Sequence, residues 1–469
     1  MAARIEKDSL GEREVPTDVY WGLQTLRAIE NFPISGIREH PRMIEAYVML
    51  KKACAIANKE LDLLDPAKAD AIVKAADEML EGKLRDQFVV DVFQAGAGTS
   101  FNMNVNEALA NRAIEILGGT KGQYNLVNPN DDVNYGQSTN DTFPTAMRIA
   151  ARLLISEFVP VLDRLIEAFA AKGVEFDHVL KSGRTHLQDA VPIRLGQEFT
   201  AYSITMKKCK RLLKEATYEV EELTIGGSAA GTGINTDPLY RFRVVELISQ
   251  WTGIQFRPAE DMCEAMESQM PMAALGAALR IIALELTRIA NDLRLLCSGP
   301  LTGLAEITLP AVQPGSSIMP GKVNPSMAEN LNMICYQVIG LAQSIDLATQ
   351  AGQLELNVMM PLIAYDAHFA LEILKNGIDV FTRFAVLGIT ADADKCRHYA
   401  ETSPSLATAL NPHVGYTVAA DVVKQALKEH KSVVDVVRER NLLTEEEIKQ
   451  IFDPYKMTEP GIPGKDGGK

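Results

Sequence analysis

Residues 272–298 read MAALGAALRIIALELTRIANDLRLLCS, and this stretch decides the fold class. Its apolar side chains recur at alternating intervals of four and three residues, which is the seam of a helix that packs against other helices. Gly299-Pro300 follows directly, and this pair is typical of a helix end. The stretch therefore predicts one long, straight helix. Its seam residues are Leu275, Leu279, Ile282, Leu286, Ile289, Leu293 and Leu296.

The same pattern occurs elsewhere in the chain. Residues 331–348 and 154–168 carry equivalent seams, and residues 204–220 and 362–384 are long amphipathic stretches. Several such helices predict an all-α protein built around an up-and-down bundle. We expect three domains: an N-terminal helical domain over residues 1–139, a central long-helix bundle over 140–394, and a small C-terminal helical domain over 395–469. A narrow bundle exposes much apolar surface, so we also expect bundles of several subunits to pack together.

Composition limits the class of partner. The chain has 469 residues and a formal net charge of -14, so it lacks the basic surface that a nucleic-acid partner requires. Its six cysteines form no C-x-x-C pair, which is typical of reduced, buried thiols. The first residues are charged and lack a signal-peptide core, and we expect no membrane span. These features predict a cytoplasmic protein.

Small polar residues gather where three helices are expected to begin. Thr99-Ser100 precedes a helix over 101–117, residues 137–142 (QSTNDT) precede a helix with Pro144 in its first turn, and residues 315–325 (GSSIMPGKVNP) precede a helix from about Ser326. Capping explains one such residue per helix. Several hydroxyls and amides beside free helix N–H groups, together with Lys322, instead predict a site for a carboxylate or phosphate. Asn324, or a capping box of Ser326 and Glu329, is expected to cap the last helix.

A fourth polar cluster, residues 183–189 (GRTHLQD), is expected to form a loop, and its neighbours favour a functional role for His186 over a structural one. No G-x-x-x-x-G-K-[ST], H-E-x-x-H or G-x-S-x-G motif is present, and the Cys and His spacing fits no metal site. The sequence therefore favours neither a nucleotide cofactor nor an intrinsic metal.

Together these clusters resemble the aspartase/fumarase superfamily. Residues 315–325 are similar to its signature, and residues 98–107, 137–141, 183–186 and 231–235 are similar to its other blocks, in the same order along the chain. The resemblance implies an all-α, three-domain subunit in a homotetramer whose active sites are each built from three subunits. It also implies a small-molecule substrate.

Within the superfamily, the sequence resembles the aspartate ammonia-lyase branch more than class II fumarases. The motif QSTND at 137–141 has the aspartase form, and Asn128 stands where fumarases carry a histidine in a second dicarboxylate site. Asp131-Asp132 and Trp21-Gly22 look like fumarase, and SMAE at 326–329 departs from the aspartase pattern. Fumarate hydratase is therefore the alternative, and a non-catalytic structural relative is a remote one.

The resemblance also implies residue roles for a reversible anti β-elimination of ammonia from L-aspartate, which passes through an enolate dianion to fumarate. Four charge-assisted hydrogen bonds at about 1.5–3 kcal/mol each would supply about 6–12 kcal/mol toward stabilising that dianion. No cofactor is implied, and activation by Mg²⁺ is left open. The implied assignments are Ser316 as base; Thr99, Ser138, Thr139 and Ser317 on the β-carboxylate; Thr185, Lys322 and Asn324 on the α-carboxylate; Asn140 and His186 near the amino group; and Glu329 as a support for Lys322 or Asn324, or as a cap.

Overall fold

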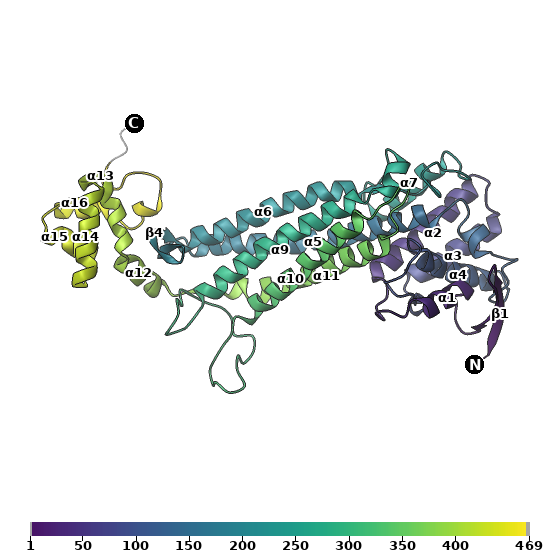
Figure 1. Ribbon diagram of the computed structural model, residues 1–469, viewed down its shortest axis with the longest axis horizontal. Coiled ribbons are helices and arrows are strands. Elements are labelled where there is room, and N and C mark those ends of the chain that lie inside the picture. The colour runs from purple at the N-terminus through teal and green to yellow at the C-terminus, as the bar shows by residue number, and fades with distance from the viewer. Residues whose placement is uncertain (1, 466–469) are drawn as a thin grey trace. The chain divides into compact units, whose positions relative to one another are not determined.

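The computed structural model describes residues 2–465. Five long helices dominate it, which confirms the all-α prediction. The described residues form two compact units, one comprising 2–160, 209–284 and 334–375 and the other 161–208, 285–333 and 376–465. Each unit contains segments of all five helices, which lie side by side as a bundle (Figure 1). These helices are α5 (Thr139–Glu175), α6 (Leu195–Val220), α9 (Met270–Leu296), α10 (Ser326–Thr349) and α11 (Met360–Phe384).

The apolar seams form the core of the bundle, as the sequence predicts. Every seam residue of α9 is buried, and the first six are completely so. Burying one such side chain contributes about 1.5–3 kcal/mol, so the α9 seam is a major part of the core. In α10 the expected seam residue Ile334 is only half-buried, and Cys335, one turn after Leu331, is buried instead.

Helix α5 begins earlier than the sequence pattern indicates. Thr139 is already helical, which places Pro144 in the second turn and not in the first. Pro160 also lies inside the helix, which continues to Glu175. The polar motif at 137–142 therefore spans the beginning of α5 instead of only preceding it.

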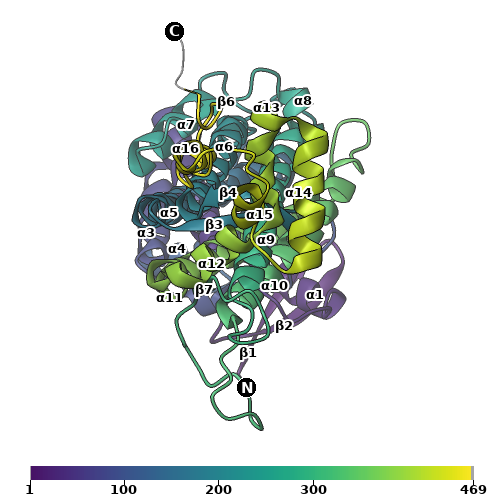
Figure 2. The same cartoon turned by 90° about the vertical axis from the view of Figure 1, so that its left-hand side faces the viewer.

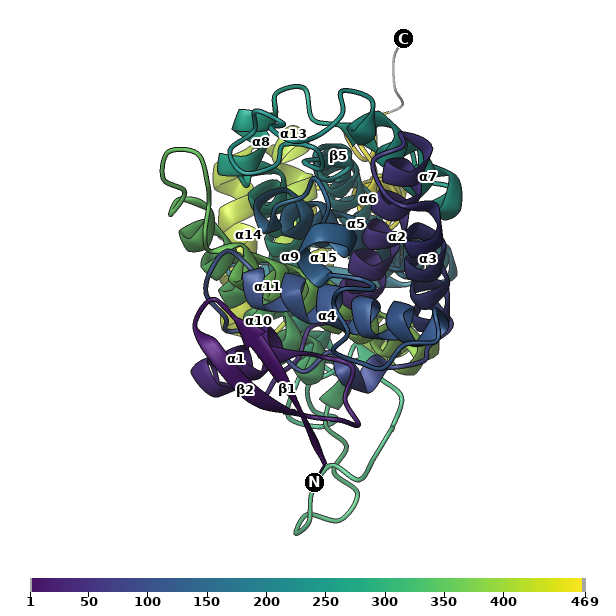
Figure 3. The same ribbon diagram turned by 90° about the vertical axis from the view of Figure 1, so that its right-hand side faces the viewer.

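The first unit also contains shorter elements, with the hairpin of β1 and β2 on one side (Figure 3). Gly22 closely approaches Glu107 of α4 and Tyr124, so no side chain fits at this position. The elements are β1 (Ala3–Asp8), β2 (Gly11–Pro16), α1 (Leu23–Asn31), α2 (Pro41–Glu60), α3 (Pro66–Leu80), α4 (Thr99–Ile116), a π turn (Pro129–Val133), β5 (Glu222–Leu223), α7 (Tyr240–Thr252), β6 (Arg257–Pro258) and α8 (Met262–Glu267).

The second unit contains a hairpin and a cluster of small helices (Figure 2). The helices pack around Leu410, Val422, Val436 and Val437, which are fully buried. The elements are β3 (Leu180–Thr185), β4 (Gln188–Arg194), β7 (Ile307–Thr308), β8 (Thr390–Ala391), α12 (Ala393–Thr402), α13 (Asn411–Val414), α14 (Tyr416–Glu429), α15 (Val433–Glu439) and α16 (Glu445–Ile451).

Helix α9 is, within residues 2–465, the one helix long and apolar enough to cross a membrane by length and composition. Its most apolar window has a mean hydropathy of 1.5, and half of that window is buried inside the protein. Because its whole seam lies in the bundle, α9 is a core helix.

The cysteines form no disulfide among the described residues. Cys54, Cys209, Cys335 and Cys396 are buried, Cys297 is half-buried and Cys263 is exposed. Four of the six therefore behave as the small apolar core residues that the sequence predicts.

Candidate active site

The first turn of α4 presents Thr99 at the surface. Gly98 precedes it with a φ of 93°, a conformation that favours glycine, and a side chain here would overlap the ring of Phe143. The Thr99 hydroxyl donates to the carbonyl of Gly96 at 2.6 Å. Its oxygen remains exposed, and the proton must turn away from Gly96 before it can serve a ligand.

Residues 137–140 form what we call the substrate loop, at the beginning of α5. The Thr139 hydroxyl accepts a hydrogen bond from Asn102 Nδ2 at 3.1 Å, and the Ser138 hydroxyl accepts one from the backbone N–H of Asn140 at 3.2 Å. Each hydroxyl therefore keeps its own proton available for an incoming carboxylate. Because Asn102 lies one turn after Thr99, the same contact brings the Thr99 turn next to this loop.

A buried lysine, Lys51, forms hydrogen bonds with the substrate loop and with the segment that precedes it. Lys51 has no exposed surface and donates to Asn134 Oδ1 and Gln137 Oε1, both at 2.8 Å. Burial lowers the pKa of Lys51 to about 7. The two amide oxygens, which belong to the segment leading into α5, are thereby fixed.

Asp141 is the fully buried acidic residue of the same segment. Its carboxylate accepts the backbone N–H groups of Ser138, Gly226 and Ser228 at 2.9–3.1 Å. Burial raises the pKa of this carboxyl to about 7, although the three N–H donors oppose the rise. Asn140 extends the same connection, since its Nδ2 donates to the carbonyl of Ala229 at 2.8 Å.

In the second unit, Thr185 and His186 lie on a hairpin, so the prediction of a loop at 183–189 is wrong in this respect. Strands β3 and β4 pair with Thr185 opposite Gln188, and His186 occupies the tight turn with a φ of 55°. The pairing of residues 180–185 with 188–194 provides backbone hydrogen bonds that the polar sequence alone does not indicate. Both Thr185 and His186 are exposed at the tip.

A buried ion cluster anchors this hairpin. Glu306 has no exposed surface, and its carboxylate contacts Lys181 Nζ at 2.9 Å and accepts from Arg184 Nη1 at 2.7 Å. Lys181 also binds Glu198. One buried carboxylate thus holds two cations of β3, the buried Lys181 and the half-buried Arg184.

The signature loop, residues 315–325, closes on itself through Gly315. The Gly315 N–H donates to the carbonyl of Lys322 at 2.8 Å, and Asn324 Nδ2 donates to the carbonyl of Gly315 at 2.6 Å. A side chain on residue 315 would overlap the Lys322 carbonyl. The loop borders a cavity of about 480 Å³, which Ser316, Met319 and Lys322 line together with neighbouring loop residues.

Ser316 is distinguished by what its hydroxyl oxygen accepts. The backbone N–H groups of Ile318 and Met319 both donate to Ser316 Oγ, at 3.2 and 2.9 Å. Such N–H donors stabilise an oxygen that carries negative charge, and this geometry is compatible with a serine that acts as a base. Lys322 and Ser317 are exposed on the same loop, and within residues 2–465 Lys322 forms no ion pair.

The end of the loop differs from the expected capping pattern. The hydroxyl of Ser326 is buried with no hydrogen-bond partner among residues 2–465, so Ser326 and Glu329 do not form a capping box. Asn324 uses its amide to close the loop. The half-buried Glu329 side chain is not hydrogen-bonded within the same range, and its supporting role stays a prediction.

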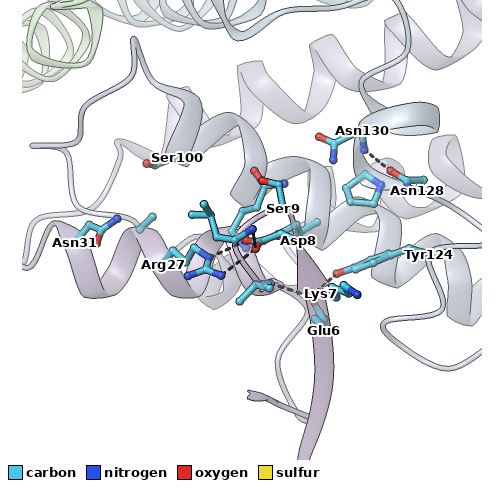
Figure 4. Close-up of a pocket in the computed structure, with 16 residues that line it drawn as sticks. Glu6, Lys7, Asp8, Ser9, Arg27, Asn31, Ser100, Tyr124, Asn128 and Asn130 are labelled. Carbon is cyan, nitrogen blue, oxygen red and sulfur yellow. Dashed lines mark hydrogen bonds and ion pairs between the residues drawn. The ribbon is translucent and has the colours of Figure 1, made fainter. Parts of the chain in front are cut away.

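A second cavity, of about 490 Å³, lies in the first unit between β1, α1 and residues 128–130 (Figure 4). Asn128 caps the following π turn by accepting hydrogen bonds from the N–H groups of Asn130 and Asp131. Its oxygen is therefore engaged locally. Ser100, the neighbour of Thr99, also lines this cavity.

The predicted site residues thus fall into two groups. Thr99, Ser138, Thr139 and Asn140 belong to the first unit, and the hairpin and signature loop belong to the second. The sequence did not single out Glu306 or Lys51, whose partners are distant in sequence. Within residues 2–465, no three His, Cys, Asp or Glu side chains are grouped as ligands of a metal ion would be.

Comparisons with known proteins identify the family of this chain. The family described as Lyase matches residues 11–340, and the family Fumarase C C-terminus matches residues 406–459. The protein is thus an all-α lyase. The chain belongs to the aspartase/fumarase superfamily, as its motifs predict.

The similar proteins favour one branch. Aspartate ammonia-lyase of Bacillus subtilis (strain 168) is 48% identical, covering 99% of this chain and 98% of its own. Aspartate ammonia-lyase of Escherichia coli (strain K12) is 46% identical, covering 98% and 97%. The predicted similarity to aspartate ammonia-lyase is thereby confirmed.

Two solved structures share the fold. A fumarate lyase:delta crystallin from Brucella melitensis, bound to cobalt, matches with a TM-score of 0.94 and 48% identity over 98% of this chain and all of that one. A class II fumarase from Schistosoma mansoni also matches with a TM-score of 0.94, at 36% identity over 98% of this chain and all of that one. The same fold therefore carries different reactions, and the choice between them depends on the site residues.

Proposed function

We propose that the protein is an aspartate ammonia-lyase that converts L-aspartate reversibly to fumarate and ammonia by anti β-elimination. The observation that carries the mechanism is the environment of Ser316, whose Oγ accepts two backbone N–H groups beside the cavity of the signature loop. A serine hydroxyl is a weak base at its free pKa and needs such activation.

The hard step removes a proton from the carbon next to the β-carboxylate. The Cβ–H proton goes to Ser316 Oγ in its alkoxide form, which becomes the hydroxyl, and the C–H electron pair moves into that carboxylate to give an enolate dianion. Thr99, Ser138, Thr139 and Ser317 supply hydroxyl donors to this group. Because Ser138 and Thr139 already accept a hydrogen bond from the protein, their protons are free to donate as the charge develops.

The second step breaks the C–N bond. Electrons return from the enolate to form the double bond of fumarate, and ammonia leaves with its electron pair. Thr185, Lys322 and Asn324 hold the α-carboxylate during this step. Asn140 and His186 lie near the amino group, and Asn140 Oδ1 is suited to accept from an ammonium because its Nδ2 already donates to Ala229.

The reaction requires no resident cofactor or metal in this proposal. Hydroxyl, amide and ammonium donors at about 1.5–3 kcal/mol each reach the range in which enzymes lower barriers, about 8–23 kcal/mol. Mg²⁺ would then act only as an activator, if it acts at all.

We further propose a homotetramer in the cytoplasm, with each site assembled from three subunits. Exposed apolar side chains on the bundle helices support the proposed assembly, because large exposed apolar patches usually mark surfaces that other protein subunits cover. They include Leu284 and Leu295 on α9 and Met333, Tyr336 and Leu347 on α10. Shared sites would also explain why the predicted residues divide between two units of one chain.

One assay tests the reaction. The purified protein is incubated with fumarate, with and without ammonium, and the loss of fumarate absorbance is followed while the products are identified. Aspartate formed only when ammonium is present supports the proposal. L-Malate formed without ammonium would instead identify a fumarate hydratase, and no conversion of either kind would contradict a catalytic role.

A further inference from the structure

Two loops of the first unit meet at a single buried carboxylate. One is the substrate loop at 137–140, and the other is the segment 224–236, which we call the glycine loop and which contains the GTGIN block at 231–235. The proposed mechanism gives the glycine loop no role. Asp141, between them, has no exposed surface.

The carboxylate uses both oxygens to join the loops. Oδ1 accepts from the N–H of Ser138 at 3.0 Å, and Oδ2 accepts from the N–H groups of Gly226 and Ser228 at 3.1 and 2.9 Å. Gly226 and Ser228 both have positive φ, 93° and 58°, so this turn is strained for Ser228 and is held by what it binds.

Further hydrogen bonds connect the same two loops. The carbonyl of Asp141 accepts the hydroxyl of Thr224 at 2.9 Å and that of Thr145 at 2.7 Å, and the two hydroxyls are 2.9 Å apart. On the other side, Asn140 Nδ2 donates to the Ala229 carbonyl. The two loops are thus connected on both sides of the carboxylate.

We propose that Asp141 is a positioning residue for ammonia elimination, which holds the glycine loop against the substrate loop so that Ser138, Thr139 and Asn140 keep their orientation toward the substrate. This inference rests on the proposed function. Asp141 itself does not touch the substrate, because it is fully buried and both of its carboxylate oxygens face backbone N–H groups inside the protein.

The test is Asp141→Asn, which keeps the shape but turns one acceptor oxygen into an N–H₂ group facing backbone N–H donors. Because misplaced donors matter most when the enolate charge develops, kcat for L-aspartate should fall by about 10²-fold while KM changes much less. Hydrogen exchange should rise together in peptides covering 134–142 and 224–236. The matched control is Asp132→Asn, a buried carboxylate of the same unit that binds Lys68 and the Asn128 N–H and should leave kcat unchanged.

The outcomes separate three cases. If folded D141N keeps the wild-type kcat and exchange pattern and loses only thermal stability, the positioning role is wrong. If D141N does not fold, Thr224→Val decides: it removes one hydroxyl bond to Asp141, and a lowered kcat with faster exchange in both peptides supports the proposal, whereas unchanged values overturn it. If the wild type itself does not convert L-aspartate, the proposed function fails, and coupled exchange in both peptides still reports whether Asp141 joins the loops.

Discussion

Replacing Glu306 should show how strongly the His186 hairpin depends on one buried charge. Glu306→Ala would leave Lys181 and Arg184 without their shared carboxylate, and breaking a buried ion pair from one side costs about 3–5 kcal/mol. Glu306→Gln keeps the shape and one acceptor oxygen, so it should lose about one charge-assisted hydrogen bond, about 1.5–3 kcal/mol.

These energies convert into measurable shifts of the melting temperature. The unfolding entropy is about 2.1 cal/mol/K per residue, which for this chain is about 1 kcal/mol/K. We therefore expect Tm to fall by about 1.5–3 °C in E306Q and by about 3–5 °C in E306A if the chain unfolds cooperatively. Because Arg184 precedes Thr185 and His186, kcat/KM for L-aspartate should fall as well. Differential scanning fluorimetry and steady-state kinetics measure the two effects.

Glu198→Gln is the matched control. Glu198 contacts the same Lys181 Nζ, at 2.8 Å, but its side chain is 22% exposed whereas that of Glu306 is fully buried, so water screens its ion pair more. E198Q should therefore lower Tm less than E306Q does. An equal or larger effect of E198Q, or an unchanged Tm in E306Q, would refute the reasoning about the hairpin anchor.

Three further predictions test other parts of the structure. Ser316→Ala should keep the fold, measured by circular dichroism, and lower kcat by about 10²–10⁴-fold; normal turnover would remove Ser316 from the mechanism. Burial and the neighbouring Asp91 charge raise the pKa of Glu39 from 4.5 to about 8, so the folded protein keeps a proton that the unfolded chain releases, and the free energy of unfolding falls as pH rises from 4.5 to 8. Glu39→Gln does not titrate, so the urea midpoint of this variant minus that of the wild type should increase over the same pH range. A difference that stays constant with pH would contradict this. Gly98→Ala should lower Tm more than Gly96→Ala, because both have positive φ but only residue 98 meets the Phe143 ring; equal shifts would show that backbone strain alone matters.

The helical core was predictable because its signal is periodic. The α9 seam is buried at every predicted position. In α10 five of the six predicted seam positions are buried; at the sixth, Ile334 is half-buried and the neighbouring Cys335 lies in the core instead. The hairpin of β3 and β4 was not predictable, because its sequence does not alternate and its stability comes from an ion cluster whose acid, Glu306, lies 122 residues from Arg184.

For the candidate site, the sequence indicated residue types and not their arrangement. Motifs indicated Ser316, Lys322 and the hydroxyls of the substrate loop, because clustered donors at helix starts are more than capping requires. The sequence could not show which hydroxyl protons already form a hydrogen bond inside the protein. The Thr99 hydroxyl donates to the Gly96 carbonyl, whereas the Ser138 and Thr139 hydroxyls only accept hydrogen bonds. Such differences depend on backbone geometry.

The distribution of charge explains how an acidic protein can bind a dianion. Residues 311–325 contain one charged residue, Lys322, and residues 225–236 contain none. Residues 133–141 contain only Asp141, which is buried and faces three N–H groups. No carboxylate in these three segments is therefore exposed to repel the substrate. The one cation, Lys322, is assigned to the α-carboxylate, whereas the groups assigned to the β-carboxylate are neutral hydroxyls that can donate more strongly as the enolate charge develops there.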